Sequence, residues 1–101
     1  MDKPEQIMIS VSENVDFKVA ANLVNRIRAA MRNEVTKIVL QFEPGITITS
    51  AEFLSFLSVT EKHLRAKEGH IRIVGANDKN RALMRIAQLD KLIYEETDIT
   101  P

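Results

Sequence analysis

The sequence predicts a single α/β domain built on a mixed, mainly parallel sheet of about four strands with amphipathic helices. Two observations support this prediction. Short β-branched and apolar runs alternate with longer segments whose apolar residues recur every three or four positions, which is typical of strand–helix–strand units with right-handed crossovers. The length of 101 residues is enough for one core without metals or disulfides, so we expect one domain over residues 1–101.

The first strand is expected at Ile7 to Val11, a β-branched stretch whose weak alternation suits a sheet edge. From Asp16 the apolar periodicity becomes helical, and Asp16 is the natural N-cap of this first helix. The apolar residues expected on its buried face are Phe17, Ala20, Ala21, Val24, Ile27 and Met31.

Lys37 to Phe42 is the expected central strand, because a run that is apolar on both faces needs cover on both sides. Pro44 and Gly45 end this strand, and a second helix is expected from about Ser50 to Lys67. Gly69 is expected to end that helix as a left-handed C-terminal cap. The core face of the second helix is predicted to consist of Phe53, Leu54, Leu57 and Leu64, with Phe56 at its margin.

His70 to Val74 alternates as a third strand and ends at Gly75. Asn77 or Asp78 is expected to cap a third helix, and Leu92 to Tyr94 can form a short last strand. The buried stripe expected on the third helix is Ala82, Leu83, Ile86 and Leu89.

The composition excludes several classes of function. Hydrophobic residues make up 45% of the chain and charged residues 28%, the balance of a folded globular protein. Fourteen basic residues against fourteen acidic ones give no net charge, so we expect no nucleic-acid partner. The chain has no cysteine, and its polar N-terminus lacks a signal sequence or membrane span. We therefore expect a cytoplasmic location without membrane insertion.

The sequence contains no template for catalysis or metal binding. Ser50 lacks the G-x-S-x-G pattern of a nucleophile elbow. His63 and His70 have no cysteine or carboxylate partner at ligand spacing. Gly45 and Gly75 stand alone rather than in a phosphate-binding loop. We predict that the protein is not an enzyme, has no catalytic residue, and binds neither a cofactor nor a metal.

The candidate functional site is the turn that carries hydroxyl groups at the start of the second helix. A helix start leaves unpaired backbone N–H groups, so a hydroxyl there can cap the helix or, once phosphorylated, present a dianion that these groups stabilise. Thr49 to Glu52 also reads as a capping box, in which the Thr49 hydroxyl accepts from the Glu52 N–H. Capping and phosphorylation at Ser50 are both open, and we expect Ser50 to face outward.

The same two interpretations apply to the neighbouring residues. Asp16 is either only an N-cap or also a partner contact, and Phe53 and Phe56 are either core residues or the flanks of a docking surface. The predicted partner-binding residues are Asn14, Asp16, Thr49, Ser50, Ala51, Glu52, Phe53 and Phe56.

With its elements in this order, the chain resembles the STAS domain, the fold of bacterial anti-sigma factor antagonists and of the regulatory domains of sulfate transporters. That family has the motif I-D-S-[ST]-G-L-x-x-L after its central strand, and here Ile48-Thr49-Ser50-Ala51-Glu52-Phe53 through Leu57 occupies that place. Ser12 to Asp16 looks like the family's S-G-x-L-D. Leu83 to Ile93 is similar to its later G-L-x-x-L-L, with Gln88 in place of the glycine.

The resemblance implies a non-enzymatic bacterial signalling protein that regulates transcription as an anti-sigma factor antagonist. Its partner would be an anti-sigma factor or a serine kinase, and phosphorylation of Ser50 would decide which protein is bound. The alternative is a constitutive STAS subunit of a lipid-transport ABC system, bound to an ABC ATPase subunit without phosphoregulation. Thr49 and Glu52 replace the motif aspartate and glycine, and this favours the alternative because Glu52 puts a negative charge near the expected phosphate.

Overall fold

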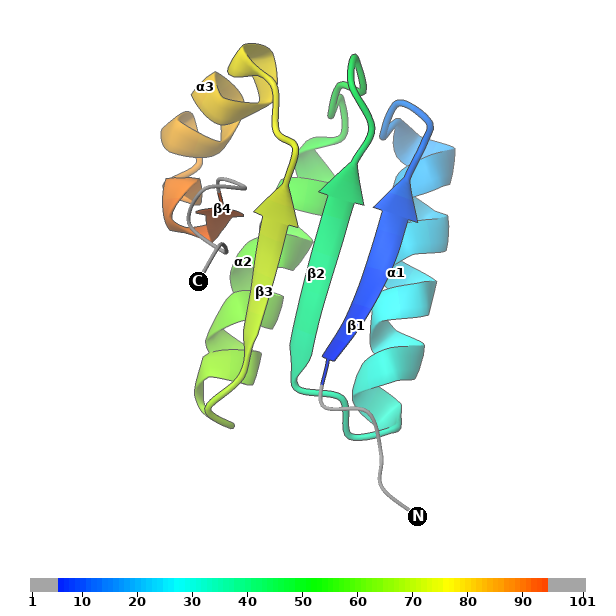
Figure 1. Ribbon diagram of the computed structural model, residues 1–101, viewed down its shortest axis with the longest axis vertical. Helices are drawn as coiled ribbons and strands as arrows, with labels where there is room; N and C mark the ends of the chain where they lie inside the picture. The colour runs from blue at the N-terminus through cyan, green and yellow to red at the C-terminus, as the bar shows by residue number, and fades with distance from the viewer. Residues whose placement is uncertain (1–5, 95–101) are drawn as a thin grey trace.

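The computed structural model describes residues 6–94, which form a four-stranded sheet with three α-helices (Figure 1). The elements are β1 (Gln6–Val11), α1 (Phe17–Arg32), β2 (Lys37–Phe42), α2 (Ala51–Arg65), β3 (His70–Val74), α3 (Asp78–Ile86), the single 3₁₀ turn η1 (Asp90–Leu92) and β4 (Ile93–Tyr94). The predicted α/β fold is confirmed. The sheet is not mixed, however, because every pair of neighbouring strands in the described residues is parallel.

The strands lie in sequence order, β1-β2-β3-β4, so β1 is at an edge and β2 is inside the sheet, as predicted. Each connection moves one strand further in the same direction. Right-handed crossovers therefore place α1 and α2 on the same face of the sheet. Figure 1 shows both helices behind β1, β2 and β3. The opposite face of these three strands has no helix over it within residues 6–94.

The core lies between the sheet and the two helices behind it. The strand register puts Ile9, Leu40 and Ile73 in one buried row across the sheet. The predicted core face of α2 is confirmed, since all four of its residues are buried. The helical side chains in the core include Ala20, Leu23, Ile27 and Ala30 from α1 and Phe53, Leu54, Leu57 and Leu64 from α2.

The predicted buried faces of α1 and α3 are partly wrong. In α1 the Phe17 side chain is 78% exposed, Ala21 is exposed as well, and Leu23 fills the core instead. In α3 the buried residues are Asn80 and Met84, whereas Ala82 is exposed and Ile86 is 85% exposed. The stripe on α3 was misassigned because its buried line begins with a polar residue, Asn80, whose amide is hydrogen-bonded inside the protein.

The helix caps follow the prediction at two of three starts. Asp16 Oδ1 accepts from Val19 N at 2.9 Å, and Asn77 Oδ1 accepts from Asn80 N at 2.8 Å. At the third start the expected capping box is wrong, because Ser50 rather than Thr49 is the N-cap. Helix α2 accordingly begins at residue 51, and it ends at residue 65, earlier than expected.

All three helices end in the same way, on a left-handed residue that is not glycine. Glu34, Glu68 and Gln88 have φ angles of 65°, 61° and 60°. After each of them, the next N–H donates to the carbonyl five residues back, as in Gly69 N to Leu64 O at 2.8 Å. The prediction that Gly69 takes the left-handed conformation is therefore wrong. Gly69 is needed for another reason, because a Cβ there would overlap the Thr36 carbonyl.

Candidate functional site

The structure brings the starts of α1 and α2 together at the carboxyl ends of the strands. Val15, just before α1, and Ile48, just before α2, form an isolated parallel bridge, and both side chains are buried. Val15 N donates to Thr47 O at 2.9 Å, and Val15 O accepts from Thr49 N at 2.9 Å. The Asn14 side chain adds a bond, accepting from Thr47 N at 2.9 Å. The two loops before α1 and α2 therefore lie side by side and form one surface.

The same segment is held from its other side by the start of α3. The Asn80 side chain is 1% exposed, and its Oδ1 accepts from Ile48 N at 3.0 Å. Its Nδ2 donates to Ile46 O at 2.7 Å, and Asn77 Nδ2 donates to the same oxygen at 3.1 Å. The backbone before α2 is thus fixed between two neighbouring helix starts. The role of Asn80 was not predicted from the sequence. The available signal was a second asparagine three positions after the Asn77 cap.

Ser50 does not face solvent, contrary to the sequence-based expectation. Its side chain is only 6% exposed, and its Oγ accepts from Phe53 N at 3.2 Å as the cap of α2. The same hydroxyl donates to Glu52 Oε2 at 3.4 Å. A neutral hydroxyl is well accommodated here, whereas added negative charge would lie beside the Glu52 carboxylate. The positive helix end favours an anion and the carboxylate opposes it.

The other predicted partner-binding residues divide into exposed and buried groups. Phe53 is buried in the core, so the prediction that it is presented to a partner is wrong for this conformation. Phe56 is half-buried. Thr49 is exposed, although its Oγ1 donates to Val15 O at 3.3 Å. The remaining predicted contacts are all exposed: Asn14, Asp16, Ala51 and Glu52.

A groove of about 240 Å³ lies between α1 and α2 next to Ser50. Phe17 stands at its α1 side with most of its ring in solvent. Sequence reasoning placed Phe17 in the core, although its position in the first turn gave a warning. Helical side chains point back toward the helix N-terminus, so the side chain of a first-turn residue extends past the ends of the strands on which the helix packs. The groove is lined by Phe17, Ala20, Ala21, Val24, Asn25, Arg28, Ser50, Glu52 and Phe53.

Arg28 connects the two walls of this groove. Its guanidinium lies 5.5 Å from the centroid of the Phe56 ring, a cation–π contact between α1 and α2. This contact holds Phe56 against α1 and leaves it half-buried. The groove therefore has aromatic rings, a basic group and the Glu52 carboxylate at its rim, which is the composition of many protein-binding surfaces.

The arrangement around Ser50 provides no general base. His63 lies in the last turn of α2, about 20 Å along the helix from its start at a rise of about 1.5 Å per residue. His70 opens β3, at the amino ends of the strands. No group of three or more His, Asp or Glu side chains in residues 6–94 could hold a metal ion. Within the same residues, no helix has the length and apolar character needed to cross a bilayer.

Comparison with protein families gives one match over nearly the whole chain. A family model described as "Mlab, STAS domain" matches residues 2–94. No curated protein matches the sequence.

Comparison with solved structures supports the same fold. The unphosphorylated form of the anti-sigma factor antagonist SpoIIAA superposes with a TM-score of 0.80 at 17% identity, over 97% of this chain and 85% of that one. The phosphorylated form of the Bacillus cell fate determinant SpoIIAA gives 0.72 at 15% identity, over 97% and 88%. The NMR structure of the protein TM1081 gives 0.73 at 15% identity, over 94% and 78%. At these identities the similarity defines the fold.

Proposed function

The chain belongs to the STAS domain family, and from this premise we propose that it is a non-catalytic module that docks a partner protein through the paired starts of α1 and α2. Ser50 and Phe53 support this surface from beneath, because both are buried. The residues proposed to contact the partner are Asn14, Asp16, Phe17, Thr49, Ala51, Glu52 and Phe56.

The single observation that carries this proposal is the exposure of Phe17 beside the groove. An aromatic ring that is 78% exposed contributes little to the fold, and burying it against a partner would remove a large apolar surface from water. Aromatic residues that flank a groove are frequent hot spots of protein interfaces. The groove runs directly from Phe17 to the Ser50 cap, so one partner element can contact both helix starts.

We propose that docking is constitutive, in the manner of the STAS subunit of a lipid-transport ABC system bound to its ATPase subunit. The Ser50 hydroxyl is buried and already accepts the cap bond from Phe53 N. A phosphate on Ser50 would have to fit at a buried position and would stand beside the Glu52 carboxylate. The matching family model, described as "Mlab, STAS domain", supports a STAS module in either candidate role.

A second candidate is a phosphorylation switch of the anti-sigma factor antagonist type. It is favoured by the serine at the start of α2 and by the similarity of the fold to SpoIIAA, whose structure is described in both unphosphorylated and phosphorylated forms. The partner would then be an anti-sigma factor or a serine kinase. Both candidates place the protein in the cytoplasm.

Docking is tested by replacing Phe17 with serine. We expect Phe17→Ser to weaken partner binding by about thirtyfold, the effect of losing a hot spot of about 2 kcal/mol. The partner is identified by mass spectrometry after affinity purification from the native host, and its affinity is then measured with purified proteins. Ile86→Ser is the matched control, because Ile86 is similarly exposed but lies on α3. Equal binding by the wild type and Phe17→Ser would reject the proposed surface.

The choice between the two candidates is tested at Ser50. Protein purified from its own host under several growth conditions is analysed by mass spectrometry, and we expect no phosphate on Ser50. Ser50→Ala should bind the partner as tightly as the wild type. A phosphate on Ser50, together with an anti-sigma factor or serine kinase as the captured partner, would establish the switch instead.

A further inference from the structure

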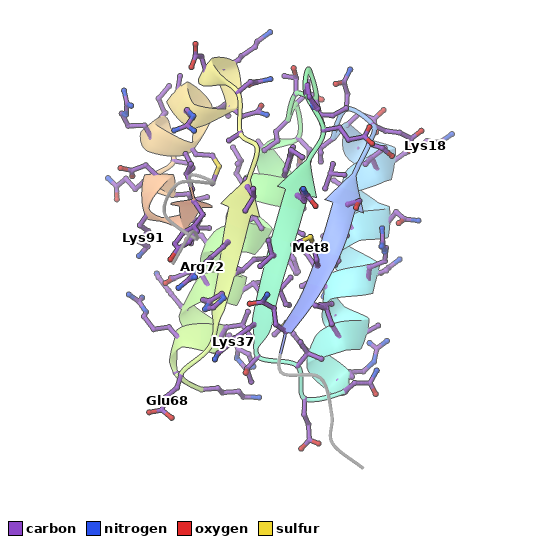
Figure 2. All side chains as sticks on the ribbon, viewed as in Figure 1. Met8, Lys18, Lys37, Glu68, Arg72 and Lys91 are labelled. Atoms are coloured by element: carbon purple, nitrogen blue, oxygen red, sulfur yellow. The ribbon has the colours of Figure 1, made fainter. Side chains whose placement is uncertain are left out.

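The face of the sheet opposite α1 and α2 has a chemistry of its own. Figure 2 shows Met8, Lys37 and Arg72 on the near side of the strands, with the two helices behind. The strand register and the alternation of side chains place nine residues on this open face: Gln6, Met8 and Ser10 of β1, Lys37, Val39 and Gln41 of β2, and His70, Arg72 and Val74 of β3. Met8 is 56% exposed. Val39 and Val74 are buried but do not belong to the main core cluster.

The charged groups of the open face are all basic. Lys37 pairs in register with His70, and Val39 pairs with Arg72, so both cations lie on neighbouring strands close to the apolar side chains of Met8 and Val39. None of the nine residues is acidic. Within residues 6–94, Glu61 pairs with Arg65 and with Lys91, whereas Lys37 and Arg72 have no carboxylate partner in this part of the chain.

Two observations show that the basic side chains of the open face are held in place rather than free in solvent. The Arg72 guanidinium lies 4.2 Å from the centroid of the Tyr94 ring, which restricts the plane of its donors. His70 Nε2 is buried and has no hydrogen-bond partner among residues 6–94, an arrangement that costs free energy until a partner arrives. Burial, followed by the charges of Arg72 and Lys37, lowers the pKa of His70, which reflects the positive potential at this end of the face.

We propose that the open face binds an acidic segment of a partner polypeptide in extended conformation. Its carboxylates would pair with Lys37 and Arg72, and its apolar side chains would cover Met8 and Val39. The two cations are offset by one strand and two residues, about 8 Å from the usual strand dimensions. Carboxylates two positions apart in an extended segment are separated by about 7 Å, so they match this spacing.

The face is less suited to a nucleic acid or a membrane. The chain has no net charge, so it has no long-range attraction for a polyanion. A surface of two full cations near the exposed Met8 side chain fits a ligand that combines single carboxylates with apolar groups. This surface is separate from the one proposed above, because Phe17 lies on the helical side of the sheet.

The probe for this proposal is a fluorescein-labelled peptide with the repeat Glu-Ser-Glu-Ser-Leu-Ser, which in extended conformation places two glutamates and a leucine on the same face. It is titrated with the full chain and followed by fluorescence anisotropy. We expect Arg72→Glu and Lys37→Glu each to weaken binding by about tenfold or more, because each puts a carboxylate against a carboxylate. The milder Arg72→Gln and Lys37→Gln should act in the same direction and guard against misfolding. Lys62→Glu makes the same charge change at an exposed position on α2 and should alter the affinity less than about twofold.

Several results would overturn the proposal. One is a similar loss of affinity in Lys62→Glu and Arg72→Glu, and another is equal binding of a peptide with lysine in place of glutamate. Residues 95–101 include three acidic residues, so a chain that ends at Tyr94 tests whether this segment is the occupant. Unchanged affinity supports a partner segment, whereas a rise of about tenfold would assign the face to the chain's own acidic end. A dimer that dissociates in Arg72→Glu would assign it to a second copy.

The outcome is independent of the proposed docking function. Phe17→Ser should leave binding of the acidic peptide unchanged, because the peptide and Phe17 lie on opposite sides of the sheet. Loss of peptide binding in Phe17→Ser would place the peptide in the α1–α2 groove and would refute the inference about the open face.

Discussion

Helices α1 and α2 start side by side, yet their caps have opposite environments. The Asp16 cap of α1 is exposed and makes one local bond, to Val19 N. The Ser50 cap of α2 is buried, and the backbone before it is bonded to Val15 and to Asn80. The difference shows that α2 begins on a rigid support, whereas α1 presents its first residue, Phe17, to solvent. We therefore expect recognition of a partner to depend on α1. The Ser50 hydroxyl is expected to have a structural role, as the cap of α2.

The largest effect on stability is expected when the hydrogen bonds that support the start of α2 are removed. Asn80→Ala deletes the acceptor for Ile48 N and one of two donors to Ile46 O, in a site that is almost wholly buried. We expect the free energy of unfolding to fall by about 2–3 kcal/mol, the cost of an unsatisfied buried backbone group plus a lost bond. Urea denaturation measures the loss. Asn22→Ala, at an exposed position of α1, should change stability by less than about 0.5 kcal/mol.

The next effect distinguishes the two hydroxyls before α2. Ser50→Ala removes the cap of Phe53 N and should cost about 1 kcal/mol. Thr49→Ala should cost less, because the Thr49 hydroxyl donates only to Val15 O at 3.3 Å and the residue is exposed. Thermal denaturation of the two variants under identical conditions ranks them. A larger loss in Thr49→Ala would mean that α2 begins with the capping box predicted from the sequence.

A smaller effect is expected at the exposed cap of α1. Asp16→Ala should reduce stability by about 0.5 kcal/mol, the low end for N-caps, because water replaces part of the lost bond. Part of this contribution comes from the charge of Asp16 at the positive helix end, so it should shrink at about 1 M salt. The effect of Ser50→Ala should not depend on salt. An equal salt dependence of the two variants would remove the contrast between the caps.

The smallest effect lies at the opposite end of the sheet and leaves both helix starts intact. Burial, then Arg72 and Lys37, lowers the pKa of His70 below its usual value of 6.5. The unfolded chain therefore takes up a proton first as the pH falls, so stability is unaffected above about pH 7 and decreases as the pH drops through 6.5 toward the folded pKa. His70→Gln should flatten this part of the stability profile, measured by urea titration at several pH values. A pH profile that is the same in His70→Gln and in the wild type would contradict this prediction.

The sequence was sufficient where the deciding interactions are between nearby residues, and insufficient where they join residues far apart in the chain. The strands, the α2 core face and the Asp16 cap depend on nearby residues, and they were predicted correctly; of the two caps predicted for α3, Asn77 or Asp78, the structure has Asn77. Ser50 rather than Thr49 is the cap because the residues before α2 are hydrogen-bonded to Val15, which lies 34 positions before Thr49. Because such partners are fixed by the fold, local patterns could not identify the cap or reveal that Ser50 is buried.

The burial of Asn80 was unpredictable for the same reason. A polar residue in a helix is normally assigned to the solvent face, and this one is buried because Ile46 and Ile48 supply partners for both ends of its amide. The apolar residues of α3 then follow a different stripe from the predicted one. The exposure of Phe17 depends on where the sheet ends, which only the assembled strands define.

The non-glycine residues in the left-handed conformation at the helix ends lower the free energy of unfolding relative to glycine at the same positions. Gln88, which follows the end of α3, has a φ of 60°, in the left-handed region that favours glycine. Glycine adopts such angles without the Cβ penalty of about 1 kcal/mol. The end of helix α3 is therefore stabilised by the hydrogen bond from Leu89 N to Met84 O, and not by a residue that adopts positive φ without strain. A more thermostable form of the protein could begin at this turn.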